Sequence, residues 1–372
     1  MRYCPRCILP DTRPHLWFDD QGNCNCATRE AKSQVDWPAR EGDFRDLAER
    51  AKARRAAYDC VIPVSGGKDS HWQVIKCLEY GMRPLCVTWK TPARNELGAR
   101  NLANLLELGV DHIDFQINPK VERRFMLKTL EDVGSPAVPL HLSIHAIPLR
   151  IATLYRIPLV VWGENSAFEY GGDAEERRDS SMNWRWFRKS LATNGTLAED
   201  WVGDGLTRED LTPYFLPSDE ELEGSGVLAV FLGYYFSWDP VETFRVARVH
   251  GFQERTEGPK TGYYDFADID DEFLISIHHF LKWYKFGFTR HCDNLSIEIR
   301  NGRMSRDEAI RIIAESGDPT PYEDIEKFCA YVGISRSRFF RIIEKFRNPE
   351  IWTKRKGKWV IEGFLVPDLE WA

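Results

Sequence analysis

Short apolar runs alternate with stretches of helical length along the middle of the chain, between residues 46 and 172. Four of the runs have the length and composition of buried strands, at Asp59–Val64, Pro84–Trp89, His112–Ile117 and Pro158–Trp162. The stretches between them predict helices at Asp69–Tyr80, Glu96–Leu108, Val121–Val133 and Ser143–Arg156. Strands and helices that alternate in this way favour an α/β fold, with a parallel sheet covered on both faces.

The two flanks of this region have different patterns. Residues 1–45 are loop-rich, and residues 173–225 are polar, which is typical of a lid or a substrate loop. Further on, the pattern becomes helical, with predicted helices at Glu272–Lys285, Ser305–Glu315, Pro321–Val332 and Ser335–Phe346. We therefore predict three parts: a cysteine-rich segment at 1–45, an α/β core at 46–172, and an insertion followed by a mostly helical region at 173–372.

Composition and charge narrow the class of protein. The chain has 372 residues, of which 43% are hydrophobic, and its formal net charge of −7 disfavours a nucleic-acid partner. No apolar run approaches the ~20 residues of a membrane span, and the N-terminus lacks the apolar core of a signal peptide. We therefore expect a cytoplasmic protein, in which a disulfide framework is not expected.

The stretch Ser65-Gly66-Gly67-Lys68-Asp69-Ser70 lies between the first predicted strand and the helix that follows it. Two adjacent glycines let the backbone turn tightly and direct its amides into one concavity, to which the helix adds its N-terminal dipole. Lys68 adds a positive charge, and Asp69 is suited to position Mg²⁺. The spacing differs from that of a P-loop and from Gly-x-Gly-x-x-Gly, but it predicts a phosphate site.

Four of the nine cysteines stand in the first 26 residues, as Cys4-x-x-Cys7 and Cys24-x-Cys26. Four thiolates can close a tetrahedral zinc site and stabilise a segment that is too short for a core of its own. We predict a structural zinc site there.

The loop resembles the pyrophosphate loop of the adenine nucleotide α-hydrolase-like ATPases, a superfamily that includes GMP and NAD synthetases, argininosuccinate synthetase and tRNA-thiolating enzymes. The resemblance implies a Rossmann-like doubly wound sheet that binds ATP and Mg²⁺ and cleaves ATP between the α- and β-phosphates. An oxygen of the substrate would be adenylated, and a nucleophile would then displace AMP. By this resemblance ATP and pyrophosphate lie against Val64, Ser65, Gly66, Gly67, Lys68, Asp69, Ser70, Thr88 and Gly163.

A second resemblance extends over nearly the whole chain, to the WbpG-like N-acetyl sugar amidotransferases of O-antigen (LPS) and related surface-glycan biosynthesis. It rests on "YCPRCILPDTRPHLWFDDQGNC", "VSGGKDS", "WGENSAFEYGG", "FLGYYFSWD" and "HHFLKWYKFGFTRHCDNLSIEIRNGRMSRDEAI". The family implies ATP-dependent transfer of ammonia to a nucleotide-linked sugar, for which we expect a UDP-linked one. It also implies two partners, a glutaminase subunit resembling that of imidazole glycerol phosphate synthase and a cyclase-like subunit. The family usually has Cys-x-x-Cys where this chain has Cys24-x-Cys26, which places Cys26 in question as the fourth zinc ligand.

The resemblance also implies site residues. Lys68, Asp69, Glu164 and Asn165 would be catalytic, and Glu169 and Tyr170 would contact the acceptor sugar. Basic residues crowded within the longest matching stretch would bind the diphosphate of the sugar nucleotide, namely Lys282, Lys285, Arg290, Arg300 and Arg303.

Two other interpretations stay open. A tRNA-thiolating enzyme can also join a zinc module to a pyrophosphate loop, but it needs a reactive cysteine in the ATPase core, where only Cys60, Cys77 and Cys86 stand. A nucleotide-binding scaffold or sensor without turnover is the other. The sequence leaves undecided which sugar and nucleotide are bound, and whether the product is an amidine or a carboxamide.

Overall fold

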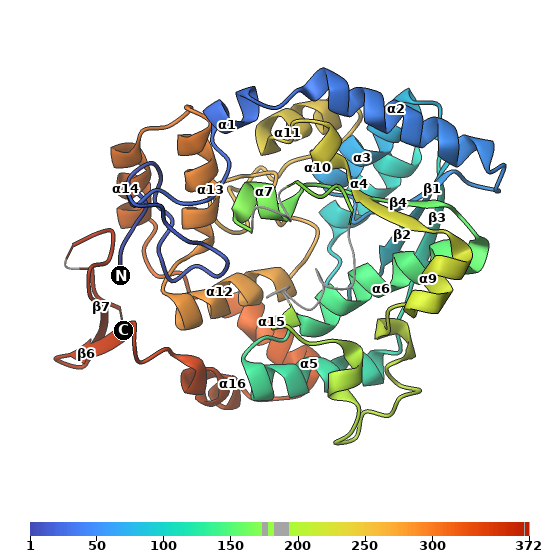
Figure 1. Ribbon diagram of the computed structural model, residues 1–372. Helices are drawn as coiled ribbons and strands as arrows, with labels where there is room; N and C mark the ends of the chain where they lie inside the picture. The colour runs from blue at the N-terminus through green and yellow to red at the C-terminus, as the bar shows by residue number, and fades with distance from the viewer. Residues whose placement is uncertain (173–177, 182–192, 368, 372) are drawn as a thin grey trace.

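The computed structural model describes residues 1–172, 178–181, 193–367 and 369–371 (Figure 1). Its centre is a five-stranded sheet in the order β3-β2-β1-β4-β5, in which all neighbouring strands are parallel. The strands are β1 (Cys60–Pro63), β2 (Pro84–Trp89), β3 (Asp111–Phe115), β4 (Leu159–Trp162) and β5 (Leu228–Phe231). Because β1 has β2 on one side and β4 on the other, the order of the strands reverses there, as in a Rossmann-like sheet.

Alternation along each strand assigns its side chains to two cores. In β1, Cys60 and Ile62 join one apolar cluster and Val61 the other; in β4, Val161 and Val160 divide in the same way. Parallel strands buried on both faces need apolar side chains at every position, which is why these runs show no polar alternation.

Helices cover both faces of the sheet (Figure 1). On one face lie α2 (Trp37–Ala53), α3 (Lys68–Glu79), α4 (Glu96–Leu106) and α11 (Pro240–Val249). On the other lie α5 (Pro119–Val133) and α6 (Val138–Tyr155), and α6 packs directly on β1, β2 and β4. The predicted α/β fold is thus confirmed, and Pro84–Trp89 is a strand with the predicted bounds.

Two boundaries of the α/β core differ from the sequence prediction. Helix α2 crosses the predicted boundary at residue 45, and β5 joins the sheet although it lies far beyond residue 172. The next strand of the sheet after β4 is thus β5, and Ser181 forms a bridge to Val230 of β5. Between β4 and β5 the described residues form the short helix α7 (Ser166–Tyr170), the 3₁₀ turns η2 (Ala198–Trp201) and η3 (Thr212–Tyr214), and α9 (Asp219–Ser225). Helix α10 (Leu232–Tyr235) follows β5 directly.

The C-terminal region is mostly helical, as predicted. It comprises α12 (Leu274–Phe286), α13 (Arg290–Arg300), α14 (Arg306–Glu315), α15 (Tyr322–Val332), α16 (Arg336–Ile343) with η4 (Glu344–Phe346), and a hairpin of β6 (Trp352–Arg355) and β7 (Lys358–Ile361). Helices α15 and α16 pack on α5, so the C-terminal helices share the core beneath the sheet. Of these elements, α13 and the hairpin were not predicted.

The N-terminal segment packs against the C-terminal helices and α7 rather than against the sheet (Figure 1). The carbonyl of Ala27 accepts a hydrogen bond from Arg300 at 2.6 Å, and its N–H donates to the Phe168 carbonyl at 3.0 Å. The Cys7 carbonyl accepts from Arg306 at 3.2 Å. The short helix α1 (Arg29–Ser33) then leads to α2.

The turn between β1 and α3 depends on one glycine. Gly66 has φ +92°, and a Cβ placed there would lie 2.7 Å from the backbone nitrogen of Leu102 on α4. Only glycine gives both this conformation and this close approach.

Gly66→Ala should therefore destabilise the protein by about 1–3 kcal/mol and lower its Tm, measured by thermal denaturation. The matched control is Gly42→Ala within α2, where a Cβ meets nothing within 4 Å. That substitution should leave the Tm unchanged or raise it, since alanine favours a helix by up to about 1 kcal/mol over glycine. Equal effects of the two substitutions would contradict the proposed constraint.

Candidate active site at the carboxyl edge of the sheet

Three cavities meet at the carboxyl ends of β1, β2 and β4. We call them the strand cavity, of about 410 Å³, the loop cavity, of about 250 Å³, and the basic cavity, of about 420 Å³. Glu164, two residues after β4, lines all three. Ligands in such sheets bind at this edge, beside the point where strand order reverses.

The loop cavity lies over the glycine loop. Ser65 and Gly67 of the loop line it, together with the first two residues of α3, Lys68 and Asp69. The loop is fixed internally, because the Ser65 N–H donates to Ser70 Oγ at 3.0 Å and the Gly67 N–H donates to Ser65 Oγ at 3.2 Å. With a glycine N-cap and no side chain capping it, α3 presents its N-terminus for an anion.

Asp69 is held in place by a segment far along the chain. Its Oδ1 accepts hydrogen bonds from Trp238 Nε1 at 2.9 Å and from Thr243 Oγ1 at 3.1 Å, while its Oδ2 pairs with Lys68 Nζ. Trp238 lies in the "FLGYYFSWD" stretch, so this stretch positions the charges of the loop.

The strand cavity is largely apolar. It is lined by Val64, Thr88 and Gly163, for which nucleotide contacts stay a prediction, and Trp89 and Trp162 add aromatic walls. Thr88 uses its hydroxyl within the sheet, donating to the Val64 carbonyl at 2.6 Å. A planar apolar group of nucleobase size fits such walls.

The basic cavity carries an excess of positive charge. Four basic residues line it against two acidic ones, and they are Arg13, Lys282, Lys285 and Arg290, with Glu164 and Asp293. Burial lowers the pKa of Lys282 and of Lys285 to about 8. Among the described residues, Lys282 has no hydrogen-bond or ion-pair partner, so its charge is available to a ligand.

Three buried histidines of the basic cavity are neutral. Burial lowers the pKa of His141 to about 3 and that of His145 to about 4, and it lowers the pKa of His278 well below its usual value. These three side chains therefore add no positive charge to the cavity near neutral pH.

Glu164 has the electrostatics of a proton acceptor. Burial, and then the charge of Asp69, raise the pKa of its carboxyl to about 7, while Lys68 opposes the shift. A carboxylate with a pKa near neutrality can take up and release a proton during turnover.

Five residues predicted for the nucleotide and sugar site do not line these three cavities: Gly66, in the turn described above, and the four residues that follow. Asn165 caps α7, since its Oδ1 accepts from the Phe168 N–H at 3.2 Å, and Glu169 pairs with Lys32 at 2.8 Å. Arg300 donates to the Ala27 and Ser296 carbonyls beside the cysteines. Arg303 pairs with Glu298 and Asp239, each at 2.7 Å. The predicted basic cluster is therefore divided, with Lys282, Lys285 and Arg290 in the basic cavity and Arg300 and Arg303 elsewhere.

Several site residues were missed by the sequence analysis. The loop before α12 contributes Asp268 and Asp270 to both the strand and loop cavities, and α6 contributes His141 and His145. No spacing in the sequence marks these residues. Arg13 lies within the N-terminal matching stretch, but a single arginine among cysteines and prolines gave no separate signal.

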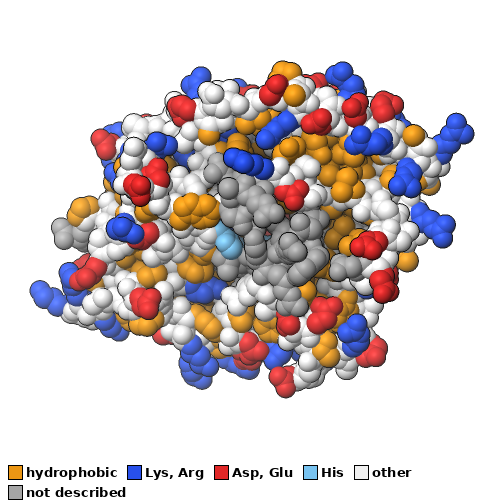
Figure 2. All heavy atoms as spheres, in the orientation of Figure 1, with side chains coloured by type: hydrophobic (Ala, Val, Ile, Leu, Met, Phe, Trp, Pro, Cys, Tyr) orange, Lys and Arg blue, Asp and Glu red, His pale blue; other side chains and the backbone are white. Residues whose placement is uncertain are grey.

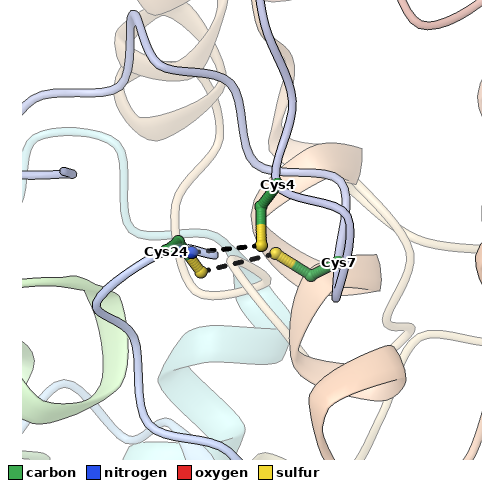
Figure 3. A group of neighbouring side chains, drawn as sticks. All are labelled: Cys4, Cys7 and Cys24. Carbon is green, nitrogen blue, oxygen red and sulfur yellow. Dashed lines mark hydrogen bonds between the residues drawn. The ribbon is translucent and has the colours of Figure 1, made fainter. Parts of the chain in front are cut away.

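The cysteine segment brings three thiols together (Figure 3). The Sγ atoms of Cys4, Cys7 and Cys24 lie within 4.8 Å of one another and point inward. Cys26 is buried nearby but is not a member of this group. Backbone N–H groups of Leu9 and Cys24 donate to Cys7 Sγ and Cys4 Sγ at 3.5 and 3.2 Å, which suits thiolate ligands. Three thiols this close together fit a zinc ion, and Cys26, which packs in the same cluster, is the candidate for a fourth ligand.

The cysteines of the α/β core are buried away from the three cavities. Cys60, Cys77 and Cys86 belong to the apolar cluster between the sheet and α3, and none of them lines a cavity described above. Burial raises the pKa of the Cys86 thiol. A tRNA-thiolating reaction at these cavities would therefore lack the reactive cysteine that it needs.

On the face that Figure 2 shows, Lys and Arg side chains are interspersed with Asp and Glu around the rim. Among the described residues, no helix is long and apolar enough to cross a membrane.

Comparison with known proteins identifies one domain. Residues 257–364 match the family described as LPS biosynthesis protein WbpG-like, C-terminal domain, which confirms the resemblance for the part of the chain that holds the last of the quoted motifs, residues 278–310. No curated protein sequence matches the chain.

Solved structures give only distant likenesses. An NH₃-dependent NAD synthetase from Campylobacter jejuni is 18% identical, with a TM-score of 0.27, over 36% of this chain and 58% of that one. An NMN synthetase from Francisella tularensis is 14% identical, with a TM-score of 0.28, over 58% and 94%. A predicted tRNA methyltransferase subunit from Methanocaldococcus jannaschii is 14% identical, with a TM-score of 0.28, over 65% and 92%. These scores are too low to relate the folds, so the fold assignment rests on the strand order of this chain. The chain spans just over half of the NAD synthetase.

Cys4→Ser should lower both the bound zinc, measured by elemental analysis of the purified protein, and the Tm, because metal binding and folding of this segment are coupled. The matched control is Cys329→Ser, since Cys329 is buried in α15 and belongs to the C-terminal core. It should lower the Tm without loss of metal. A full equivalent of zinc in the Cys4 variant would exclude Cys4 as a ligand.

Proposed function

We propose, from the premise that residues 257–364 form a WbpG-like C-terminal domain, that this chain is an ATP-dependent amidotransferase of surface-glycan biosynthesis. It would adenylate the acetamido oxygen of a nucleotide-linked N-acetyl sugar and transfer ammonia to the same carbon. The products would be an acetamidino sugar, AMP and pyrophosphate. A carboxylate oxygen could be activated by the same chemistry, giving a carboxamide.

One observation carries this proposal: Glu164 lies where an apolar cavity, a glycine-loop cavity and a basic cavity meet. The three differ in chemistry, and each suits one part of the reaction. A nucleobase fits the first, a pyrophosphate the second and an anionic sugar nucleotide the third. The reacting atoms would then lie beside one titratable carboxylate.

In this assignment the adenosine of ATP occupies the strand cavity, and its β- and γ-phosphates lie against the amides of the loop and Lys68. Mg²⁺ prefers carboxylate oxygens, and Asp69, Asp268 and Asp270, which all line the loop cavity, fit that preference. When bound, Mg²⁺ would offset the charge of the departing pyrophosphate. Lys68 and the N-terminus of α3 offset it from the protein side.

The sugar nucleotide would lie in the basic cavity, with its diphosphate near Lys282 and Lys285 and its sugar directed toward Glu164. Both lysines are charged at pH 7, since their pKa values are near 8. An anionic ligand would supply the counter-charge that Lys282 lacks within the protein, and it would raise the pKa of both lysines.

The chemistry would proceed in two steps. The acetamido oxygen attacks the α-phosphorus of ATP, the bond to the β-phosphate oxygen breaks, and pyrophosphate leaves. Ammonia then adds to the activated carbon and gives up a proton to Glu164. Finally the C–O bond breaks, so that AMP departs with the oxygen that came from the sugar.

The nitrogen would come from a partner. We propose the glutaminase subunit resembling that of imidazole glycerol phosphate synthase, with a cyclase-like subunit, since the described residues of this chain offer no cysteine at the three cavities for glutamine hydrolysis. Free ammonium salt should replace this partner in a test tube.

The deciding experiment follows the oxygen. The purified chain is incubated with Mg-ATP, an ammonium salt and a panel of UDP-, dTDP-, CMP- and GDP-linked N-acetyl sugars labelled with ¹⁸O in the acetamido carbonyl. Pyrophosphate release, appearance of ¹⁸O in AMP and a product in which NH replaces oxygen would support the proposal, and NMR would locate the new nitrogen. AMP without label would exclude activation of the acetamido oxygen, and no turnover on UDP-, dTDP-, CMP- or GDP-linked sugars would contradict the proposed substrate class.

Glu164→Gln should lower kcat by about 10²–10⁴-fold at a fixed concentration of free ammonia, because the proton acceptor is lost. In the unmodified protein, kcat at fixed free ammonia should rise with pH through about 7, as the Glu164 carboxyl loses its proton. The Gln variant should lack this rise. Glu169→Gln, on the short helix α7 that follows Glu164, is the control, since it breaks the pair with Lys32 and should keep the pH dependence. A pH profile that is unchanged in the Glu164 variant would exclude the role.

A further inference from the structure

The N-terminal cysteine segment forms part of the wall of the basic cavity. Arg13, Pro14 and His15 line this cavity beside Lys282 of α12 and Arg290 of α13. The segment thus contributes to the same cavity as the domain at the other end of the chain.

Hydrogen bonds on either side of Arg13 hold this wall in position. Thr12 Oγ1 donates to the Phe286 carbonyl at the end of α12 at 2.6 Å. Asn25 Nδ2 donates to the Gly172 carbonyl at 3.1 Å, and the cysteine cluster closes the loop between these two contacts. The segment therefore has a fixed relation to α12 and to the end of α7.

Arg13 is oriented by two further contacts. Its Nε pairs with Asp293 at 2.9 Å, and its Nη1 donates to the Tyr170 carbonyl at 2.5 Å. Its Nη2 has no partner among the described residues, although the side chain is only 14% exposed. A guanidinium that is held at two nitrogens and open at the third is preorganised to bind an oxyanion.

From this geometry we infer that Arg13 binds the anionic diphosphate of the substrate, together with Lys282, and that the cysteine segment serves to position it. The inference rests on the proposed function, since it assigns a ligand contact within the proposed sugar-nucleotide cavity. It gives the cysteine segment a role in substrate binding that does not involve nucleic acid.

A purely structural role for Arg13 is the competing interpretation, because the pair with Asp293 alone would justify a buried arginine. The two roles predict different binding behaviour. A ligand contact affects affinity for the diphosphate alone, whereas a packing defect would affect both nucleotide sites and the Tm together.

The test is calorimetric titration of the intact chain with two probes, UDP for the basic cavity and α,β-methylene-ATP for the strand and loop cavities. The variants are Arg13→Gln, Arg13→Lys and the double variant R13Q/D293N, which removes both charges of the pair and leaves no unpaired carboxylate. The matched control is Arg6→Gln, an exposed arginine of the same segment. Tm and bound zinc are measured for each.

We expect the Kd for UDP to rise at least about tenfold in Arg13→Gln and in the double variant, with the Kd for α,β-methylene-ATP, the zinc content and the Arg6 control unchanged. Arg13→Lys should give a Kd for UDP between those of the unmodified protein and Arg13→Gln, since lysine keeps the positive charge but cannot donate two parallel hydrogen bonds as a guanidinium can. Unmodified protein that binds the ATP analogue but neither UDP nor any UDP-sugar would overturn the proposed substrate and this inference with it. Unmodified protein that binds UDP, with a double variant that binds it equally well, would overturn this inference alone. Loss of affinity for both probes in parallel with a lower Tm in the double variant would also overturn it, in favour of the structural role.

Discussion

A line of four charges of alternating sign, none with a side chain more than 20% exposed, connects the N-terminal segment to the three cavities, and the arrangement of the site depends on it. Arg13 pairs with Asp293 at 2.9 Å, Asp293 lies 3.9 Å from Arg290, and Arg290 pairs with Asp268 at 3.1 Å. Although burial opposes ionisation of Asp293, the charge of Arg13 lowers its pKa to about 2. Each charge is costly to bury alone, so each holds its neighbour in position. Three segments that are distant in sequence are thereby fixed around one site.

The same line explains where the cavities divide. Arg290 borders both the basic cavity and the loop cavity, while Asp268 borders the loop cavity and the strand cavity. Asp268 has a φ of +54°, a strained conformation for this residue, and its carboxylate accepts from Arg290 and Thr261. The strain is tolerated because the surrounding ion pairs determine the position of this loop. The walls between the proposed phosphate-binding regions are thus made of paired charges rather than apolar side chains.

The sequence predicted the parts of this site that lie within one short stretch of chain, and it missed the parts that come together from distant stretches. A loop between a strand and a helix is determined by its own residues, so the glycine turn, Lys68 and the carboxyl edge of the sheet were found from spacing. The sequence groups five basic residues into one predicted cluster because they are close along the chain. The structure divides them, because residues close in sequence need not face the same cavity. Arg290 and Arg300 stand at opposite ends of α13, about 15 Å apart along its axis, so they cannot bind one diphosphate. Lys282 and Lys285, three residues apart on α12, do share a face and a cavity. Arg13, Asp268 and the histidines of α6 come together only through tertiary packing, which no periodicity records.

The charge of the basic cavity also constrains how nitrogen can reach the reacting carbon under the proposed function. With His141, His145 and His278 neutral, the cavity holds four positive lysine and arginine side chains against Glu164 and Asp293. Such a cavity attracts an anionic sugar nucleotide and repels ammonium, whereas uncharged ammonia crosses it without an electrostatic cost. Ammonia that reached Glu164 through bulk water would be mostly protonated near neutral pH and would have to lose a proton before entry. Delivery of unprotonated ammonia from a docked source avoids that step, which makes the charge of this cavity a physical reason for a separate nitrogen-supplying partner.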